Sequence, residues 1–289
     1  MLGTCRPFGL CTKNLCNTTT VTRRPQLYLE IFIGVAFIAL SVYSIWIEPY
    51  RIDVTRHELR SAGKSERFKL VQVSDLHLHA FGKHERELAK QIAALNADVI
   101  VLSGDAIDRV EAVPWLRAFV DELGNVPVLI VLGNWEHWSA VSVESLKSTG
   151  AKLLLNERWN LRKGKRSLTV LGLDDYTAGQ PDLGLLSMNS SDDGSQTTVL
   201  VQHSPGFFDQ ASVKQKMKTN HFDLCLSGHT HGGQVALLGW APMRPVGSGR
   251  YTSGFYEIVG CPLYVSRGIG TSVLPIRFGS RPEFSVFDL

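Results

Sequence analysis

Asp75 and His77 stand one residue apart, directly after a short apolar run at residues 70–73. In an extended chain, residues i and i+2 point to the same side, so a carboxylate oxygen and an imidazole nitrogen can face a common point. A bound cation requires this arrangement. Because Asp and His are ordinary residues at strand ends, the pair indicates a metal site only if other parts of the chain supply further ligands.

Further potential ligands follow other apolar runs, at residues 99–102, 126–132, 198–201 and 222–226. Polar groups at the carboxyl ends of neighbouring strands converge on one edge of an α/β sheet, where such proteins place their sites. The residues that this pattern brings together are Asp75, His77, Asp105, Asn134, His203, His229 and His231.

This set of oxygen and nitrogen ligands is too large for one transition metal. It suits two divalent cations about 3.5–4 Å apart that share one carboxylate. Imidazole with carboxylate favours Mn, Fe, Zn or Co over Mg or Ca, and we expect Mn. Gly104, Gly133 and Gly228 each precede a ligand, and glycine permits the sharp exit that turns a strand-end side chain toward a shared centre.

The elements that position these residues alternate between strands and helices. Apolar residues at helical spacing predict helices at 85–95, 114–123 and 142–149. The alternation before residue 150 indicates an α/β fold with a buried sheet, and the later part is richer in strands. Besides the runs above, strands are expected at 52–60, 152–156, 167–173, 257–259, 263–265 and 284–287, with a surface loop at 180–196.

Residues 27–47 form an apolar run whose one charge is Glu30. This length spans the hydrocarbon core of a bilayer, and Tyr28, Tyr43 and Trp46 near its ends suit the interface. We therefore expect a single-pass membrane anchor, with a buried core helix or a cleaved signal sequence as alternatives. The orientation stays open, because the acid-free basic tail favours an external catalytic domain whereas basic residues at 51–69 oppose it.

We expect four segments: a basic polar tail at 1–26, a transmembrane helix at 27–47, a juxtamembrane linker with a leading strand at 48–67, and a catalytic domain at 68–289. With 30 Lys and Arg against 27 Asp and Glu, the charge is nearly balanced, which disfavours nucleic acid as a partner. The cysteines match no zinc knuckle. Because Cys225 and Cys261 are far apart in the sequence, we expect free thiols.

In chain order, the motifs D-x-H, GD, GN, H and GHTH resemble those of the calcineurin-like metallophosphoesterases. The resemblance runs from about residue 68 to the end. The segments RYTSGFYE (250–257) and YVSRGIGTSVLPIRFGSRPEF (264–284) look like the membrane-anchored bacterial branch, some members of which cleave UDP-diacylglucosamine in lipid A biosynthesis. The resemblance implies a four-layered α/β/β/α sandwich and a hydrolase of phosphodiester or pyrophosphate bonds at the bacterial inner membrane.

By position, the resemblance gives each metal four ligands and makes Asp105 the bridge. A hydroxide shared by the metals would attack phosphorus without a covalent enzyme intermediate. The first metal would be held by Asp75, His77, Asp105 and His231. The second would be held by Asp105, Asn134, His203 and His229. The catalytic residues would be Asp75, Asp105, Asn134 and His229.

Many family members carry a histidine after the GN pair that protonates the leaving oxygen, whereas this chain has Trp135. An indole N–H cannot donate its proton at neutral pH. His137 either replaces the usual histidine as proton donor or is a surface residue. His79 and His84 are weaker candidates for the proton donor. Because a phosphate that leaves from a diphosphate has a second pKa of about 6, we expect diphosphates and activated aryl esters to be cleaved in preference to alkyl phosphates.

The expected substrate is a lipid- or nucleotide-linked diphosphate such as UDP-diacylglucosamine. A broad-specificity phosphodiesterase and a catalytically silent scaffold are the alternatives, although scaffolds usually lose metal ligands and every position is filled here. Trp240, Pro242 and Met243 form either an apolar lip for an acyl chain or a packed loop. Arg267 is a further candidate for a forked phosphate contact, or for a structural ion pair. The residues expected to bind substrate are Trp135, His137, Arg250 and Arg277.

Overall fold

The computed structural model describes residues 23–59, 67–187 and 195–289. Most of the basic tail with Cys5, Cys11 and Cys16, residues 60–66 and part of the loop expected at 180–196 lie outside the described residues. The chain separates into two units, Met1–Val42 and Tyr43–Leu289.

The first unit contains helix α1 (Arg23–Val42). Among the described residues, one segment of 27 residues, Arg24–Tyr50, is long and apolar enough to cross a membrane, and none of its apolar window is buried. The expectation that the N-terminal apolar run is a helix and a candidate membrane span is confirmed. The segment continues beyond α1 as a π-helical turn, Tyr43–Ile47, and a 3-10 turn, Glu48–Tyr50, which belong to the second unit.

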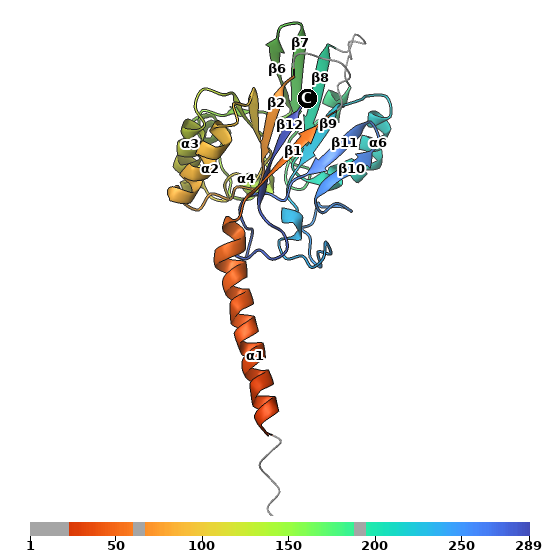
Figure 1. Cartoon of the computed structure of the whole chain (residues 1–289). Coiled ribbons are helices and arrows are strands. Elements are labelled where there is room, and N and C mark those ends of the chain that lie inside the picture. Colours follow the sequence, from red (N-terminus) through yellow and green to blue (C-terminus); the bar gives the residue numbers. More distant parts are fainter. Residues whose placement is uncertain (1–22, 60–66, 188–194) are drawn as a thin grey trace, which may run out of the picture. The chain divides into compact units, whose positions relative to one another are not determined.

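The described part of the second unit is built on two six-stranded sheets (Figure 1). In spatial order, the first sheet contains β1 (Asp53–Glu58), β12 (Glu283–Asp288), β2 (Lys69–Val73), β3 (Val99–Leu102), β4 (Val128–Ile130) and β5 (Lys152–Leu153). The second contains β10 (Gly254–Ile258), β11 (Cys261–Val265), β9 (Leu224–Ser227), β8 (Gln196–Val201), β7 (Arg166–Gly172) and β6 (Glu157–Lys163).

The centre of each sheet is parallel. β2, β3 and β4 run in one direction in the first sheet, and β7, β8 and β9 do so in the second. Parallel strands are covered on both faces, which explains why β3 reads as the uninterrupted apolar run VIVL. The carboxyl ends of these strands therefore gather potential ligands at one edge of each sheet.

Alternate residues of β3 enter different cores, because successive side chains in a strand point to opposite faces. Ile100 and Leu102 pack in a core with residues of α2 (Lys83–Ala93), α3 (Val113–Glu122) and α5 (Val143–Lys147). Val99 and Val101 pack in a second core between the two sheets. The outer face of the second sheet packs with α6 (Ala211–Met217). These layers are the expected α/β/β/α sandwich, which is confirmed.

Some elements were not predicted, and they are short or lie at an edge. α4 (Asn134–Trp138) and α6 have five and seven residues, too few to establish a helical period. β6 is an edge strand whose outward residues are polar or charged, so it lacks a clear apolar run.

The expectation of free thiols is wrong for Cys225 and Cys261, which form a disulfide with Cα atoms 6.0 Å apart. The reason is topological: β9 and β11 are adjacent parallel strands, although Cys225 and Cys261 are 36 residues apart in the sequence. Spacing along the chain did not reveal this pairing.

Candidate metal centre

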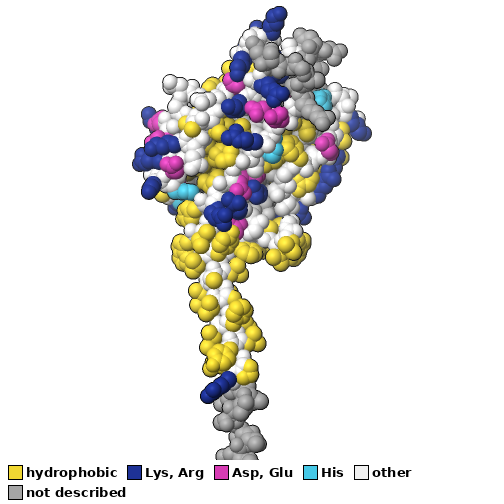
Figure 2. Space-filling model, viewed as in Figure 1, with side chains coloured by type: hydrophobic (Ala, Val, Ile, Leu, Met, Phe, Trp, Pro, Cys, Tyr) yellow, Lys and Arg dark blue, Asp and Glu magenta, His cyan; other side chains and the backbone are white. Residues whose placement is uncertain are grey.

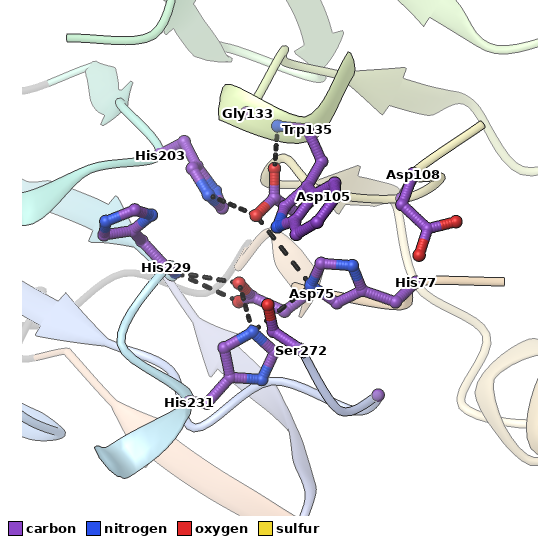
Figure 3. Close-up of polar contacts among 12 residues, drawn as sticks. Asp75, His77, Asp105, Asp108, Gly133, Trp135, His203, His229, His231 and Ser272 are labelled. Atoms are coloured by element: carbon purple, nitrogen blue, oxygen red, sulfur yellow. Dashed lines mark hydrogen bonds and ion pairs between the residues drawn. The ribbon is translucent and has the colours of Figure 1, made fainter. Parts of the chain in front are cut away.

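The expected ligands lie where parallel strands end. Asp75 and His77 follow β2, Asp105 follows β3, and His203 follows β8. The structure brings these residues into two buried groups whose ligand atoms lie within 4.8 Å of one another (Figure 3). Among the described residues, the first group is Asp75, His77 and His231, and the second is Asp105, His203 and His229.

Asp105, a member of the second group, also approaches the first group. Its Oδ2 atom is 3.1 Å from Nε2 of His203 and 3.8 Å from Nε2 of His77. The His77 and His231 Nε2 atoms are 3.2 Å apart, and His231 Nε2 is 3.5 Å from Asp75 Oδ1. Three ligand atoms thus face one point, and the Asp105 carboxylate reaches toward both points, as a bridging ligand must.

The ligand positions share an unusual backbone. Asp75, His77, Asp105, His229 and His231 have φ values of 51°, 42°, 52°, 69° and 50°, in the left-handed region. Non-glycine residues there cost about 1–3 kcal/mol each and persist only where the surroundings fix them, typically at functional sites. Hydrogen bonds supply this support: His77 N donates to Asp105 O at 3.0 Å, and His229 N donates to Asp75 Oδ1 at 3.0 Å.

The glycines before the ligands act mainly by allowing close approach. A Cβ atom on Gly133 would lie 2.2 Å from Asp105 Oδ1, and one on Gly228 would lie 2.4 Å from Asp75 Oδ2. Gly104 alone of the three has a positive φ, 100°. The sharp backbone turn that we expected at all three glycines is thus needed at Gly104. Gly133 and Gly228 instead leave space for the carboxylates.

The outer nitrogens of two histidines are fixed by backbone carbonyls. His203 Nδ1 lies 2.8 Å from Ser103 O, and His229 Nε2 lies 2.8 Å from Val246 O. When one ring nitrogen donates its N–H to a carbonyl, the other ring nitrogen carries a lone pair that faces inward. A metal requires this tautomer.

A second observation, at Asn134, supports a site for divalent cations. Asn134 is buried, and its Oδ1 has no hydrogen-bond partner among the residues the structure describes. A buried amide oxygen without a partner is costly, and a cation would satisfy it. Asn134 is not part of either acid–histidine group, but it is the first residue of α4, which follows β4 after residues 131–133.

Burial favours neutral imidazoles at His77 and His231, and the bridging carboxylate is ionised. Burial would also lower the pKa of His203, but the charge and hydrogen bond of Asp105 raise it well above its usual value. Burial lowers the pKa of His77 to about 4, and burial with the charge of His77 lowers the pKa of His231 well below its usual value. Burial would raise the pKa of Asp105, but the charge and hydrogen bond of His203 hold it well below its usual range. Burial raises the pKa of Asp75 to about 6. Lone pairs of His77 and His231 are therefore available near pH 7.

Glu136 is a site residue whose role the sequence interpretation missed. Its buried carboxylate accepts the backbone N–H groups of Ala106 at 2.7 Å and of Gly133 at 2.8 Å. It also accepts the N–H groups of Asp105 and Ile107, both at 3.1 Å. Glu136 thereby ties the Asp105 loop to the start of α4. Its place at the third position of α4, where a capping-box glutamate stands, was the available signal.

Trp135 lies beside the first group. Its ring meets the His77 ring edge-on, with centroids 5.9 Å apart, and the Trp138 ring at 5.4 Å. Its backbone N–H donates to Asp105 Oδ1 at 2.9 Å. The side chain is partly exposed, so it both packs at the metal edge and presents a surface.

His137 pairs with Asp174, which sequence reasoning did not select. His137 Nε2 is 2.7 Å from Asp174 Oδ1, and this hydrogen bond raises the pKa of His137. His79 is exposed and lies 2.8 Å from the Arg109 guanidinium, and His84 packs against the Tyr50 ring.

The arginines differ from one another. Arg277 is fully buried, and its Nε, Nη1 and Nη2 atoms all donate to backbone carbonyls, including Gly270 O and Ser280 O. A direct substrate contact by Arg277 does not fit this geometry, because its donors are already used. Arg267 pairs with Glu283 and Asp53. Arg250 is exposed, 3.7 Å from Asp209, and accessible to a ligand.

Comparisons with known proteins agree with this geometry. The sequence model of the calcineurin-like phosphoesterase family matches residues 68–233. An uncharacterized metallophosphoesterase of Bacillus subtilis, YkuE, is 32% identical over 269 residues, which cover 86% of this chain and 88% of YkuE. The phosphodiesterase YaeI of Escherichia coli is 28% identical and covers 86% of this chain and 92% of its own. A transmembrane protein with metallophosphoesterase domain from Bos taurus is 27% identical, over 96% of this chain and 65% of its own. The chain belongs to the calcineurin-like metallophosphoesterase family.

Proposed function

We propose that this protein is a membrane-anchored hydrolase of phosphodiester or diphosphate bonds that uses two divalent cations. The observation that carries the proposal is the Asp105 carboxylate, which faces ligand groups on both sides. The cations would be held by Asp75, His77, Asp105 and His231, and by Asp105, Asn134, His203 and His229.

When bound, two divalent cations supply Lewis acidity, which lowers the pKa of the attacking water and neutralises charge on the phosphate oxygens. The protein itself positions the ligand side chains and sets their protonation states. Glu136 holds the Asp105 loop, backbone carbonyls set the tautomers of His203 and His229, and burial keeps His77 and His231 neutral.

The leaving group determines the preferred substrate, because Trp135 stands where a proton donor is usual. A leaving phosphate or aryl oxide needs little protonation, whereas an alkoxide needs a full proton. We therefore propose diphosphates and activated esters as substrates, with a lipid- or nucleotide-linked diphosphate such as UDP-diacylglucosamine as the first candidate. The exposed Arg250 and the partly exposed Trp135 and His137 are proposed to contact the substrate.

We also propose that the catalytic domain lies on an oxidising side of the membrane. The buried disulfide between Cys225 and Cys261 supports this, since disulfides persist in oxidising compartments and are rare in the cytosol. The acid-free basic tail before the candidate span supports the same orientation.

A substrate panel with added Mn²⁺ tests the function. It contains UDP-diacylglucosamine, other lipid diphosphates and bis-p-nitrophenyl phosphate, with Asp105→Ala as the blank. Hydrolysis of at least one class by the wild type, lost in Asp105→Ala, is the expected result. No hydrolysis of any class by a protein loaded with metal would contradict the proposal.

A further inference from the structure

An exposed apolar rim lies beside the metal centre. We define the docking rim as Leu237, Leu238, Trp240, Met243, Val246 and Val273. Leu238 is 100% exposed, Val246 92% and Val273 88%, which is extreme for large apolar side chains in water. Figure 2 shows hydrophobic side chains gathered on the lower edge of the second unit in that view.

The rim is tied to the end of the candidate membrane span. Ala236 N donates to Phe278 O at 2.7 Å, and Gln234 Nε2 donates to Leu274 O at 2.9 Å, so the two segments of the rim are joined. Arg277 N, in turn, donates to Ser44 O at 2.9 Å. Ser44 belongs both to the candidate span Arg24–Tyr50 and to the second unit. The rim is thus held beside residues that are themselves candidates for the bilayer.

The charges around the rim suit a lipid surface. Residues 234–250 contain no Asp or Glu and two arginines, Arg244 and Arg250, both exposed. Residues 268–282 contain no acid either. Asp209, from another segment, lies 3.7 Å from Arg250. An apolar surface flanked by arginine can enter the headgroup region, where arginine is attracted by anionic lipids.

The rim also touches the metal centre directly. In the rim, Val246 O accepts the N–H of His229 Nε2 at 2.8 Å. Three residues before the rim begins, Gln234 N donates to His231 O at 2.9 Å. A cavity of about 220 Å³ connects the end of the candidate span with the first ligand group, and its lining includes Tyr50 and His77. The cavity therefore offers a molecule at the end of the candidate span a path to the first ligand group.

We propose that the docking rim enters the interface of the bilayer that holds the chain's own span, and that the substrate is a phosphate ester of a membrane lipid. The hydrogen bond between Arg277 N and Ser44 O, and the absence of acids from residues 234–250 and 268–282, favour a bilayer over a second copy of the chain. The substrate class rests on the proposed function, whereas the docking depends on the surface alone.

Quenching of Trp240 fluorescence by lipids brominated on their acyl chains tests the docking. The full chain is placed in nanodiscs of phosphatidylcholine and phosphatidylglycerol, with and without brominated phosphatidylcholine. Trp240→Phe removes the reporter, and because Trp240 is 68% exposed this variant should fold normally. Val259→Trp in the Trp240→Phe background is the matched control. Val259 is exposed before β11, which runs parallel to β9, and so lies at the strand end opposite the ligands.

We expect brominated lipid to quench the wild-type fluorescence more than that of Trp240→Phe, because Trp240 contributes a quenched component. The tryptophan introduced by Val259→Trp in the Trp240→Phe background should not restore this component. Equal quenching of the wild type and Trp240→Phe would overturn the docking rim. Hydrolysis of water-soluble bis-p-nitrophenyl phosphate is measured on the same wild-type preparation. An active protein with unquenched Trp240 contradicts only the docking, and an inactive protein with quenched Trp240 contradicts only the function.

Discussion

Glu136 accepts the backbone N–H of Ala106 at 2.7 Å, although the two residues are 30 positions apart in the sequence. The same carboxylate holds Gly133 N at 2.8 Å, so it joins the loop that carries Asp105 to the helix that carries Asn134. Two proposed ligands of one cation are therefore placed by a residue that is not itself a proposed ligand.

Glu136→Gln should loosen the centre without removing a ligand. An amide nitrogen cannot accept an N–H, so buried donors would lose their partner, at a cost of about 1–3 kcal/mol. We expect a lower melting temperature and lower metal content by mass spectrometry. Glu144→Gln, at an exposed glutamate in α5, should change neither. Unchanged metal content in Glu136→Gln would show that the carboxylate does not position the ligands.

Arg277 and Arg250 should respond in opposite ways to replacement by methionine. Arg277→Met would leave several buried carbonyls without donors and remove a group 3.4 Å from His231 Nδ1, so stability and metal content should both fall. Arg250→Met should leave the melting temperature unchanged and raise KM, because Arg250 is exposed. A stable Arg277→Met enzyme with a raised KM would restore the substrate contact that the structure disfavours.

The pair of His137 and Asp174 predicts a pH dependence of stability. The hydrogen bond to Asp174 raises the pKa of His137 above 6.5 in the folded state. The contribution of His137 to the free energy of unfolding is therefore complete below pH 6.5 and is lost as the pH rises through the folded-state pKa. Burial would raise the pKa of Asp174, but His137 lowers it overall, so its contribution is lost only as the pH falls below about 4. Melting temperatures of His137→Gln and the wild type should differ more at pH 6 than at pH 8.5. An equal difference at both would contradict the pairing.

The absence of a histidine at Trp135 predicts a steep dependence on the leaving group. Bis-p-nitrophenyl phosphate should be hydrolysed at least about 100-fold faster than a dialkyl phosphate, since general acid catalysis is worth about 10²–10⁴-fold. The ratio should be unchanged in His137→Gln if His137 is not the proton donor. Equal rates for aryl and alkyl esters in the wild type would show that another group supplies the proton.

The disulfide predicts a loss of stability on reduction. Cys225→Ser should lower the free energy of unfolding by about 2–4 kcal/mol. In cells, the two thiols should resist alkylation until the protein is denatured and reduced. Alkylation of both cysteines after denaturation without reductant would place the domain in a reducing compartment and contradict the proposed orientation.

The sequence revealed the ligand types and the strands before them because buried parallel strands read as apolar runs such as VIVL at β3. It did not reveal what depends on neighbours in space. Cys225 and Cys261 meet because β9 and β11 are adjacent, and Arg277 is buried because backbone carbonyls converge on it. Glu136 stands three residues after Gly133, which is the spacing of a capping box, but its partners at 105–107 come from another loop.

The central claim is that two divalent cations share Asp105. The most direct measurement is metal content by inductively coupled plasma mass spectrometry, taken with bis-p-nitrophenyl phosphate hydrolysis, for the wild type, Asp105→Ala and the control His221→Ala, at an exposed histidine. We predict close to two divalent metals per chain and activity in the wild type and in His221→Ala, and loss of both in Asp105→Ala. Less than one metal per chain in the wild type, with no hydrolysis after Mn²⁺ is added, would contradict the claim.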